Sequence, residues 1–157
     1  MGNKSHYVLV HGAGHGAWCW YKLAGLLESA GHKVTAMDLT GCGIDSTNIS
    51  EVKSVHEYVK PLMEVMAALS SDERVVIVGH SFGGISISFA IQAFPQKIAV
   101  AVFATAYIGP PDSPLSECFV EVHILVNYHS LQRQVYIYIF IVWFVFYLIS
   151  ELDLFTT

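Results

Sequence analysis

The sequence has 157 residues, of which 13 are Asp or Glu and 8 are Lys or Arg, giving a formal net charge of −5. Because nucleic acids and anionic membrane surfaces attract basic proteins, this charge argues against both as partners. The length is typical of one domain, and the cysteines have neither CxxC nor metal-ligand spacing; they are Cys19, Cys42 and Cys118. We therefore expect reduced thiols, no metal site and a cytoplasmic location, which the lack of a secretory signal in the first residues also favours.

The first third of the chain predicts two strands with a helix between them. Residues 7–10 are a short apolar run that ends in the Gly-rich turn HGAGHG, which is typical of a strand. Residues 17–30 predict a helix that Gly31 ends. Residues 34–39 predict a second strand, closed by TGCG. The helix would turn one apolar face to the strands, formed by Trp20, Leu23, Leu27 and Ala30.

The middle of the chain predicts a second helix over residues 54–69, where apolar side chains recur at helical intervals. Ser54 and Glu57 have the spacing of a capping box, which marks the start of a helix. Pro61 lies inside this run, and we expect it to kink or restart the helix because proline removes a backbone donor.

Three further segments complete the alternating pattern. Residues 75–78 predict a buried strand, residues 83–94 a helix that ends before a proline, and residues 98–104 another strand. Alternating strands and helices favour a parallel sheet with helices on its faces, and strands this apolar are buried on both sides. We therefore predict an α/β fold with a mostly parallel sheet, whose site lies at the carboxyl ends of the strands.

The pentapeptide Gly79-His80-Ser81-Phe82-Gly83 fits G-x-S-x-G and lies between a predicted strand and a predicted helix, the context of a nucleophile elbow. The glycines let the backbone pass through a strained turn that holds the serine out at a helix N-terminus, where the helix dipole favours negative charge. A tight strand–helix turn with a capping serine is the alternative interpretation.

The turn His11-Gly12-Ala13-Gly14 follows the first predicted strand. Such a turn can aim a backbone N–H at the same point as the N–H of Phe82, and two such donors form an oxyanion hole. A simple strand-to-helix connection is the alternative. We expect His11 and His15 to be structural.

Together with these motifs, the stretches YVLVHGAGHGAWCWYKLAGLLESAGHKVTAMDL, VVIVGHSFGG and FPQKIAVAVF resemble the plant methylesterase and hydroxynitrile lyase family of α/β-hydrolases. The resemblance covers about residues 5–121 and implies the N-terminal part of an α/β-hydrolase fold. Family esterases hydrolyse small methyl esters of plant hormones, such as methyl salicylate, methyl jasmonate and methyl indole-acetate, and need no cofactor.

Position by position, the resemblance implies that Ser81 is the nucleophile and that the amides of Ala13 and Phe82 form the oxyanion hole. It also implies that Gly12 and His80 are substrate-binding residues of the esterase type. Lyases of the family tend to carry a threonine at the position of Gly12, whose hydroxyl contacts the cyanohydrin oxygen. Glycine leaves room for an ester instead.

The resemblance also implies that the chain is truncated at its C-terminus, because the family's catalytic acid and histidine lie beyond the matching part. The histidines that follow Ser81 are His123 and His129, and Asp112 precedes them. We do not expect these three residues to form the triad, because Asp112 lies in the turn GPPDSP and both histidines lie where the family begins its cap.

We therefore divide the chain into a partial α/β-hydrolase domain, residues 1–121, and a divergent apolar tail, residues 122–157. Within the tail, residues 135–149 (VYIYIFIVWFVFYLI) carry no charge. This stretch is interpreted as a cover for the incomplete sheet, an aggregation-prone segment or a membrane anchor, although it is shorter than the roughly 20 residues that a spanning helix needs. The last predicted strand, residues 98–104, would be an open edge that favours a homo-oligomer or aggregate.

These observations predict a carboxylic ester hydrolase that acts on a small methyl ester and is impaired by loss of the triad Asp and His. A hydroxynitrile lyase is one alternative, against which Gly12 argues. A catalytically inactive hydrolase fragment, which binds a ligand or has no function, is the other. The sequence leaves open whether the chain is an active enzyme.

Overall fold

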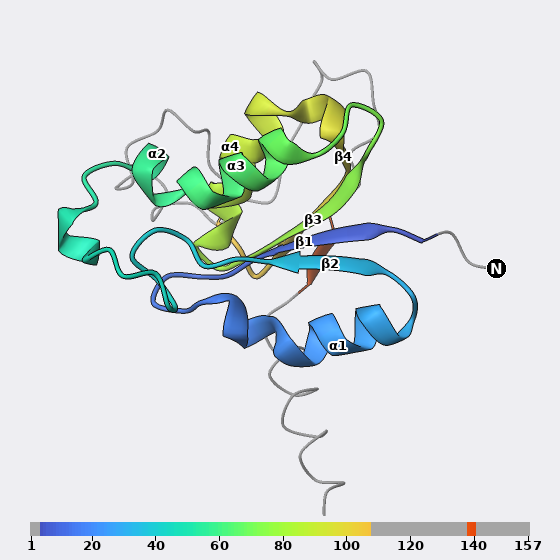
Figure 1. Ribbon diagram of the computed structural model, residues 1–157, viewed down its shortest axis with the longest axis horizontal. Helices are drawn as coiled ribbons and strands as arrows, with labels where there is room; N and C mark the ends of the chain where they lie inside the picture. The colour runs from blue at the N-terminus through green and yellow to red at the C-terminus, as the bar shows by residue number, and fades with distance from the viewer. Residues whose placement is uncertain (1–3, 108–137, 141–157) are drawn as a thin grey trace, which may run out of the picture.

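Five parallel strands form one sheet in the order β2-β1-β3-β4-β5 (Figure 1). The computed structural model describes residues 4–107 and 138–140. The strands are β1 (His6–Val10), β2 (Lys33–Ala36), β3 (Val75–His80), β4 (Ile98–Ala104) and β5 (Tyr138–Phe140). The predicted α/β class with a parallel sheet is thus confirmed. The strand order reverses at β1, and open α/β sheets place their sites at the carboxyl ends beside such a reversal.

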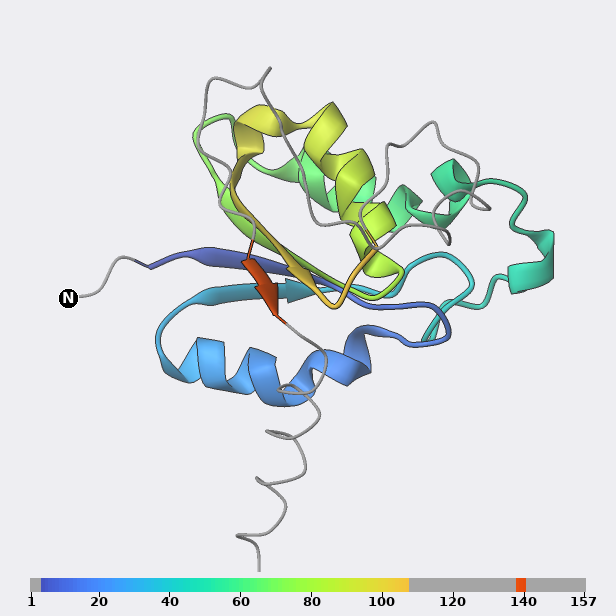
Figure 2. The same ribbon diagram turned by 180° about the vertical axis from the view of Figure 1, so that it is seen from behind.

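Helices lie on both faces of this sheet. The helix α1 (Tyr21–Ser29) covers one face, and α3 (Lys60–Ala68) and α4 (Gly83–Ala93) cover the other, as both views show (Figures 1 and 2). Shorter helices lie in the connections: the 3-10 helices η1 (Ala17–Trp20), η2 (Ile49–Glu51) and η3 (Pro95–Lys97), and the single-turn α2 (Val55–Tyr58). None of the helices described is long and apolar enough to cross a membrane.

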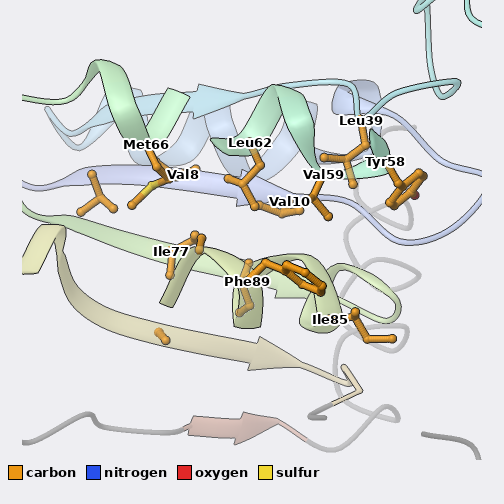
Figure 3. Packing of buried hydrophobic residues seen from close by; sticks show 14 of the residues in the cluster. Val8, Val10, Leu39, Tyr58, Val59, Leu62, Met66, Ile77, Ile85 and Phe89 are labelled. Atoms are coloured by element: carbon orange, nitrogen blue, oxygen red, sulfur yellow. The ribbon is translucent and has the colours of Figure 1, made fainter. Parts of the chain in front are cut away.

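The hydrophobic core lies between the sheet and the helices α3 and α4 (Figure 3). Because strand side chains alternate between faces, Val8 and Val10 of β1 point to this side together with Ile77 of β3. They pack against Leu62 and Met66 of α3, and all five side chains are fully buried.

The opposite face is covered less completely than predicted. The predicted helix over residues 17–30 is η1 followed by α1, and no residue of either helix is buried. Leu23, placed on the buried face by its spacing, is 38% exposed, and Leu26 is 65% exposed. The reason is that α1 packs against β2 at one edge of the sheet, so a single described helix on this face touches little of its width.

The second predicted helix is divided as its proline indicated. The helix α2 ends at Tyr58 and α3 begins at Lys60, which places Pro61 in the first turn of α3, where its missing N–H costs nothing. The Ser54 side chain accepts a hydrogen bond from the Glu57 amide at 3.1 Å, which confirms the predicted N-cap. The Glu57 carboxylate reaches back to the Lys53 amide at 2.8 Å, one residue earlier than in a capping box.

The prediction of an open edge at residues 98–104 is wrong for the second half of that strand. Val102, Phe103 and Ala104 of β4 pair with Tyr138, Ile139 and Phe140 of β5, respectively (Figure 2). An unpaired parallel edge exposes backbone donors and acceptors, and the aromatic and β-branched stretch 135–149 is suited to satisfy them. For residues 138–140, this pairing supports the interpretation as a cover for the sheet; the rest of the stretch lies outside the described residues. The domain boundary at residue 121 lies outside the described residues and stays a prediction.

Candidate active site

Ser81 lies in the sharp turn between β3 and α4, with a φ of 53° in the left-handed region. A non-glycine residue with such a φ is uncommon and stores strain, which often marks a functional position. The Ser81 amide donates to the Ala104 carbonyl at 3.3 Å, and the Ser81 carbonyl accepts from the Tyr107 amide at 3.1 Å. The chain after β4 therefore fixes the turn from one side.

The two glycines of G-x-S-x-G are required by close contacts between backbones. A Cβ at Gly79 would lie 2.6 Å from the Gly83 carbonyl oxygen, and a Cβ at Gly83 would lie 2.6 Å from that of Val10 and 2.7 Å from that of His11. The start of α4 thus packs directly against the end of β1. This geometry matches a nucleophile elbow and explains both glycines, whereas a capping serine alone would require neither.

The turn after β1 passes directly beside Ser81. A Cβ at Gly12 would lie 3.0 Å from the Ser81 Cβ, so the two turns are in contact at this point. The His15 amide closes the turn by donating to the Gly12 carbonyl at 3.2 Å, and Gly14 takes the left-handed φ of 70° that the turn needs. The structure therefore brings Gly12 and Ala13 next to the elbow, and the role of the Ala13 and Phe82 amides as oxyanion donors stays a prediction.

His11 is fully buried and makes two hydrogen bonds to backbone. Its Nδ1–H donates to the Gly12 carbonyl at 2.8 Å, and its Nε2 accepts from the Leu39 amide at 3.0 Å. These partners require the neutral ring, and burial holds the pKa of His11 below its usual value of 6.5, although the nearby Asp38 carboxylate opposes this shift. The structural role expected for His11 is confirmed. The same bond turns residues 37–39 out of the sheet, so β2 is shorter than the predicted strand 34–39.

His80 lies beside Gly12, with its Nδ1 3.3 Å from the position of a Cβ on that glycine. The ring packs edge-on against His15 (6.2 Å between ring centroids) and Trp20 (6.4 Å), and Trp18 stacks on His15 at 5.5 Å. Burial, and then His15, lower the pKa of His80, so its ring is neutral near pH 7.

This aromatic wall, formed by His15, Trp18, Trp20 and His80, was not predicted as a unit. The two tryptophans of AWCW, directly after HGAGHG, were the available signal, but only Trp20 was assigned a place, on the buried face of a helix. Trp18 is 61% exposed, and the buried Nε1 of Trp20 has no hydrogen-bond partner within the described residues. The wall places flat aromatic rings beside Gly12, which contacts the elbow at Ser81.

The structure therefore brings Gly12, Ala13, His80, Ser81 and Phe82 together at the carboxyl ends of β1 and β3. His11 is not available as a general base, because its Nδ1 is bonded to the Gly12 carbonyl and its Nε2 to the Leu39 amide. The Nδ1 of His15 is bonded to the Ala13 carbonyl at 3.0 Å, and no described hydrogen bond joins His15 to Ser81. The other residues considered for a triad lie outside the described residues: Asp112, His123 and His129.

Comparison with known proteins agrees with this geometry. Residues 7–149 match the model of the "Alpha/beta hydrolase family". The chain is 55% identical over 119 residues to "Methylesterase 2" of Arabidopsis thaliana, covering 75% of the chain and 44% of that protein. It is 52% identical over 120 residues to "Methyl jasmonate esterase 1" of Vitis vinifera, covering 76% of the chain and 46% of that protein.

Among solved structures, the crystal structure of polyneuridine aldehyde esterase is similar, with a TM-score of 0.71 and 51% sequence identity. That match covers 74% of this chain and 46% of the other. The chain thus spans less than half the length of these relatives.

Proposed function

The chain belongs to the alpha/beta hydrolase family, and from this premise we propose that it is a carboxylic ester hydrolase whose nucleophile is the Ser81 hydroxyl. The observation that carries the proposal is the strained φ of 53° at Ser81, held between two glycines that pack against neighbouring backbone. This strained turn presents a hydroxyl at the carboxyl ends of the strands, and acyl transfer requires an exposed nucleophile of this kind.

In the proposed reaction, the Ser81 Oγ attacks the ester carbonyl carbon, and the negative charge that forms on the carbonyl oxygen is accepted by the Ala13 and Phe82 amides. Collapse of this intermediate breaks the bond to the alkoxy oxygen, which takes up the proton that the Ser81 hydroxyl loses and departs as the alcohol, and leaves an acyl-serine ester. Water then attacks the acyl carbon and releases the acid, which regenerates the hydroxyl. Donors placed at the developing charge typically contribute a factor of about 10²–10³ each.

The described residues include the proposed nucleophile and the proposed oxyanion donors, and the general base is unassigned among them. His11 is committed to two backbone partners, and His15 to one. An active-site serine without its base retains roughly 10³–10⁴-fold catalysis over water through the oxyanion hole and binding. We therefore propose a rate well below that of a complete serine esterase, and the inactive fragment is the second candidate that this observation favours.

The proposed substrates are small methyl esters of aromatic or oxylipin acids. Gly12 packs tightly against the elbow, since a Cβ there would lie 3.0 Å from the Ser81 Cβ and 3.2 Å from the His80 carbonyl oxygen. The aromatic wall beside Gly12 suits a flat or apolar acyl group. Gly12 also disfavours the lyase alternative, because glycine has no hydroxyl to contact a cyanohydrin.

The test compares the wild-type chain with Ser81→Ala in the hydrolysis of methyl jasmonate and methyl salicylate, followed by the appearance of the free acid. The proposal predicts a slow rate above background in the wild type and none in the variant. An equal rate in both proteins would refute Ser81 as the nucleophile, and a folded wild-type protein with no rate at all would favour the inactive fragment. Release of cyanide from a cyanohydrin would instead support the lyase.

A further inference from the structure

The carboxylate of Asp38 lies between the loop that follows β1 and the loop that follows β2. Its Oδ1 accepts a hydrogen bond from the Ala17 amide at 2.6 Å, and its Oδ2 accepts one from the Ile44 amide at 3.2 Å. Asp38 is half-buried, so water only partly replaces these bonds when they are lost. One side chain thus joins two loops that are separate in the sequence.

Gly16 and Gly43 show that the backbone of both loops packs directly against this carboxylate. A Cβ at Gly43, which has a φ of 60°, would overlap the Cγ and Oδ1 of Asp38. A Cβ at Gly16 would lie 2.6 Å from the Asp38 Oδ1 and 2.7 Å from the Gly43 Cα. The loops therefore touch each other directly at the carboxylate, and no side chain fits on either of them at that point.

The segment that contains Ala13 is fixed at both ends to residues that follow β2. At one end, His11 Nε2 accepts from the Leu39 amide at 3.0 Å, and at the other the Ala17 amide donates to Asp38. Ala13 lies between these two anchors, in the turn that the bond from the His15 amide to the Gly12 carbonyl closes. The second anchor fixes where this turn lies relative to Ser81, and the direction of the Ala13 N–H depends on that placement.

We propose that Asp38 is a positioning residue for the reaction at Ser81, because its carboxylate holds residues 11–17 so that the Ala13 amide points at the developing oxyanion. The effect of Asp38 on the reaction rate rests on the proposed function, ester hydrolysis at Ser81. The proposal goes beyond that function in assigning part of the oxyanion geometry to a carboxylate that contacts neither the nucleophile nor the substrate.

The loop after β2 offers a matched control. Asp45 is also an aspartate of this loop whose carboxylate accepts two backbone hydrogen bonds, from the Gly41 amide at 2.9 Å and the Thr47 amide at 3.0 Å. Both partners of Asp45 belong to its own loop. The variants Asp38→Asn and Asp45→Asn therefore make the same chemical change, and only the first weakens the link to residues 11–17.

The second variant, Ala17→Pro, removes the bond from the other side without changing Asp38. Ala17 is the first residue of η1, a position that proline occupies readily, and Gly16 before it already has the extended φ of −160° that proline favours. This variant keeps the test available if Asp38→Asn does not fold.

The experiment measures the second-order rate constant for phosphonylation of Ser81 by a fluorophosphonate, the amide NMR signal of Ala13 in protein labelled with ¹⁵N-alanine, and the thermal unfolding midpoint. We expect Asp38→Asn and Ala17→Pro to slow phosphonylation about tenfold or more and to shift the Ala13 signal, while both proteins remain folded. Asp45→Asn should leave the rate constant and the signal unchanged.

The proposal is overturned if Asp38→Asn and Ala17→Pro keep the wild-type rate constant and Ala13 signal, or if Asp45→Asn lowers the rate constant equally. If the folded wild-type protein is not phosphonylated, the proposed function fails. The Ala13 signal in the three variants then still decides whether Asp38 positions that amide.

Discussion

His11 is a buried imidazole whose neutral form is required by its two backbone partners. Because its pKa in the folded protein is below 6.5, the unfolded chain takes up a proton first as the pH falls. The stability that neutral His11 contributes is therefore complete above the unfolded pKa, declines as the pH falls below about 6.5 and is fully lost below the folded pKa. His80, whose pKa is also lowered, acts in the same direction.

We thus predict that the thermal unfolding midpoint decreases between pH 7.5 and pH 5.5, and that the decrease is smaller in His11→Asn. The carboxylates of Asp45 and Glu73 have lowered pKa values, so they remain charged throughout this range and do not contribute to the slope. A midpoint that is independent of pH in the wild type, or a slope that His11→Asn leaves unchanged, would contradict this account of the buried ring.

Gly83 is a residue at which the elbow has no room for a side chain. Because a Cβ there would lie 2.6 Å from the Val10 carbonyl oxygen, we predict that Gly83→Ala lowers the free energy of unfolding by about 1–3 kcal/mol. The control is Gly25→Ala, since Gly25 lies within α1 with no atom within 4 Å of its Cβ position; that change should raise the free energy of unfolding by about 0.5–1 kcal/mol. Urea denaturation measures both, and equal effects would show that backbone packing at the elbow is not what requires glycine.

Single residues of the candidate site could be predicted from the sequence where chemistry and backbone geometry require a short motif. Gly79, Ser81 and Gly83 could be recognised because a strained elbow needs them at a fixed spacing. Asp38 could not be found in this way, because its role depends on a contact between two loops that have no common pattern in the sequence.

The C-terminus of α3 is closed by a side chain from a distant part of the chain. The Lys97 Nζ donates to the carbonyls of Met66 and Ala67 at 3.0 Å each, and to that of Leu69 at 2.8 Å. These carbonyls have no partner within the helix, and a cation there also interacts favourably with the helix dipole.

We predict that Lys97→Met lowers the free energy of unfolding by about 1–2 kcal/mol, because three backbone acceptors lose a charged donor. Lys60→Met serves as the control: Lys60 is exposed and, within residues 4–107, its ion pair is with Glu64 at 3.8 Å, so its loss should cost no more than about 0.5 kcal/mol. Urea denaturation of the two variants compares them directly, and an equal cost would argue against the capping role of Lys97.

Strands and helices were predictable where the local sequence pattern is typical of one secondary structure only. The strands β1, β3 and β4 are continuous apolar runs and appear within two residues of their predicted bounds. The end of β2 was missed because the Leu39 amide donates to His11 rather than to a neighbouring strand. The pairing of β5 with β4 joins segments more than thirty residues apart, which no local pattern specifies.

At the scale of the whole sheet, the described residues bury their apolar side chains mainly on one face. Leu62 on α3 is fully buried, whereas Leu26 on α1 is 65% exposed. Their replacement by alanine provides a matched pair, since both are leucines within helices. We predict that Leu62→Ala costs about 2–5 kcal/mol of unfolding free energy and Leu26→Ala less than about 0.5 kcal/mol, as measured by urea denaturation. A large cost for Leu26→Ala would mean that α1 is covered in the protein in solution.

The central claim is that this fold presents Ser81 as a nucleophile. The most direct measurement is peptide mapping by mass spectrometry after the purified, folded chain has reacted with a fluorophosphonate, with Ser81→Ala treated in parallel. We predict a phosphonyl group on Ser81 in the wild type and none on the variant. A folded wild-type chain without the adduct, or an adduct that persists in Ser81→Ala, would contradict the claim.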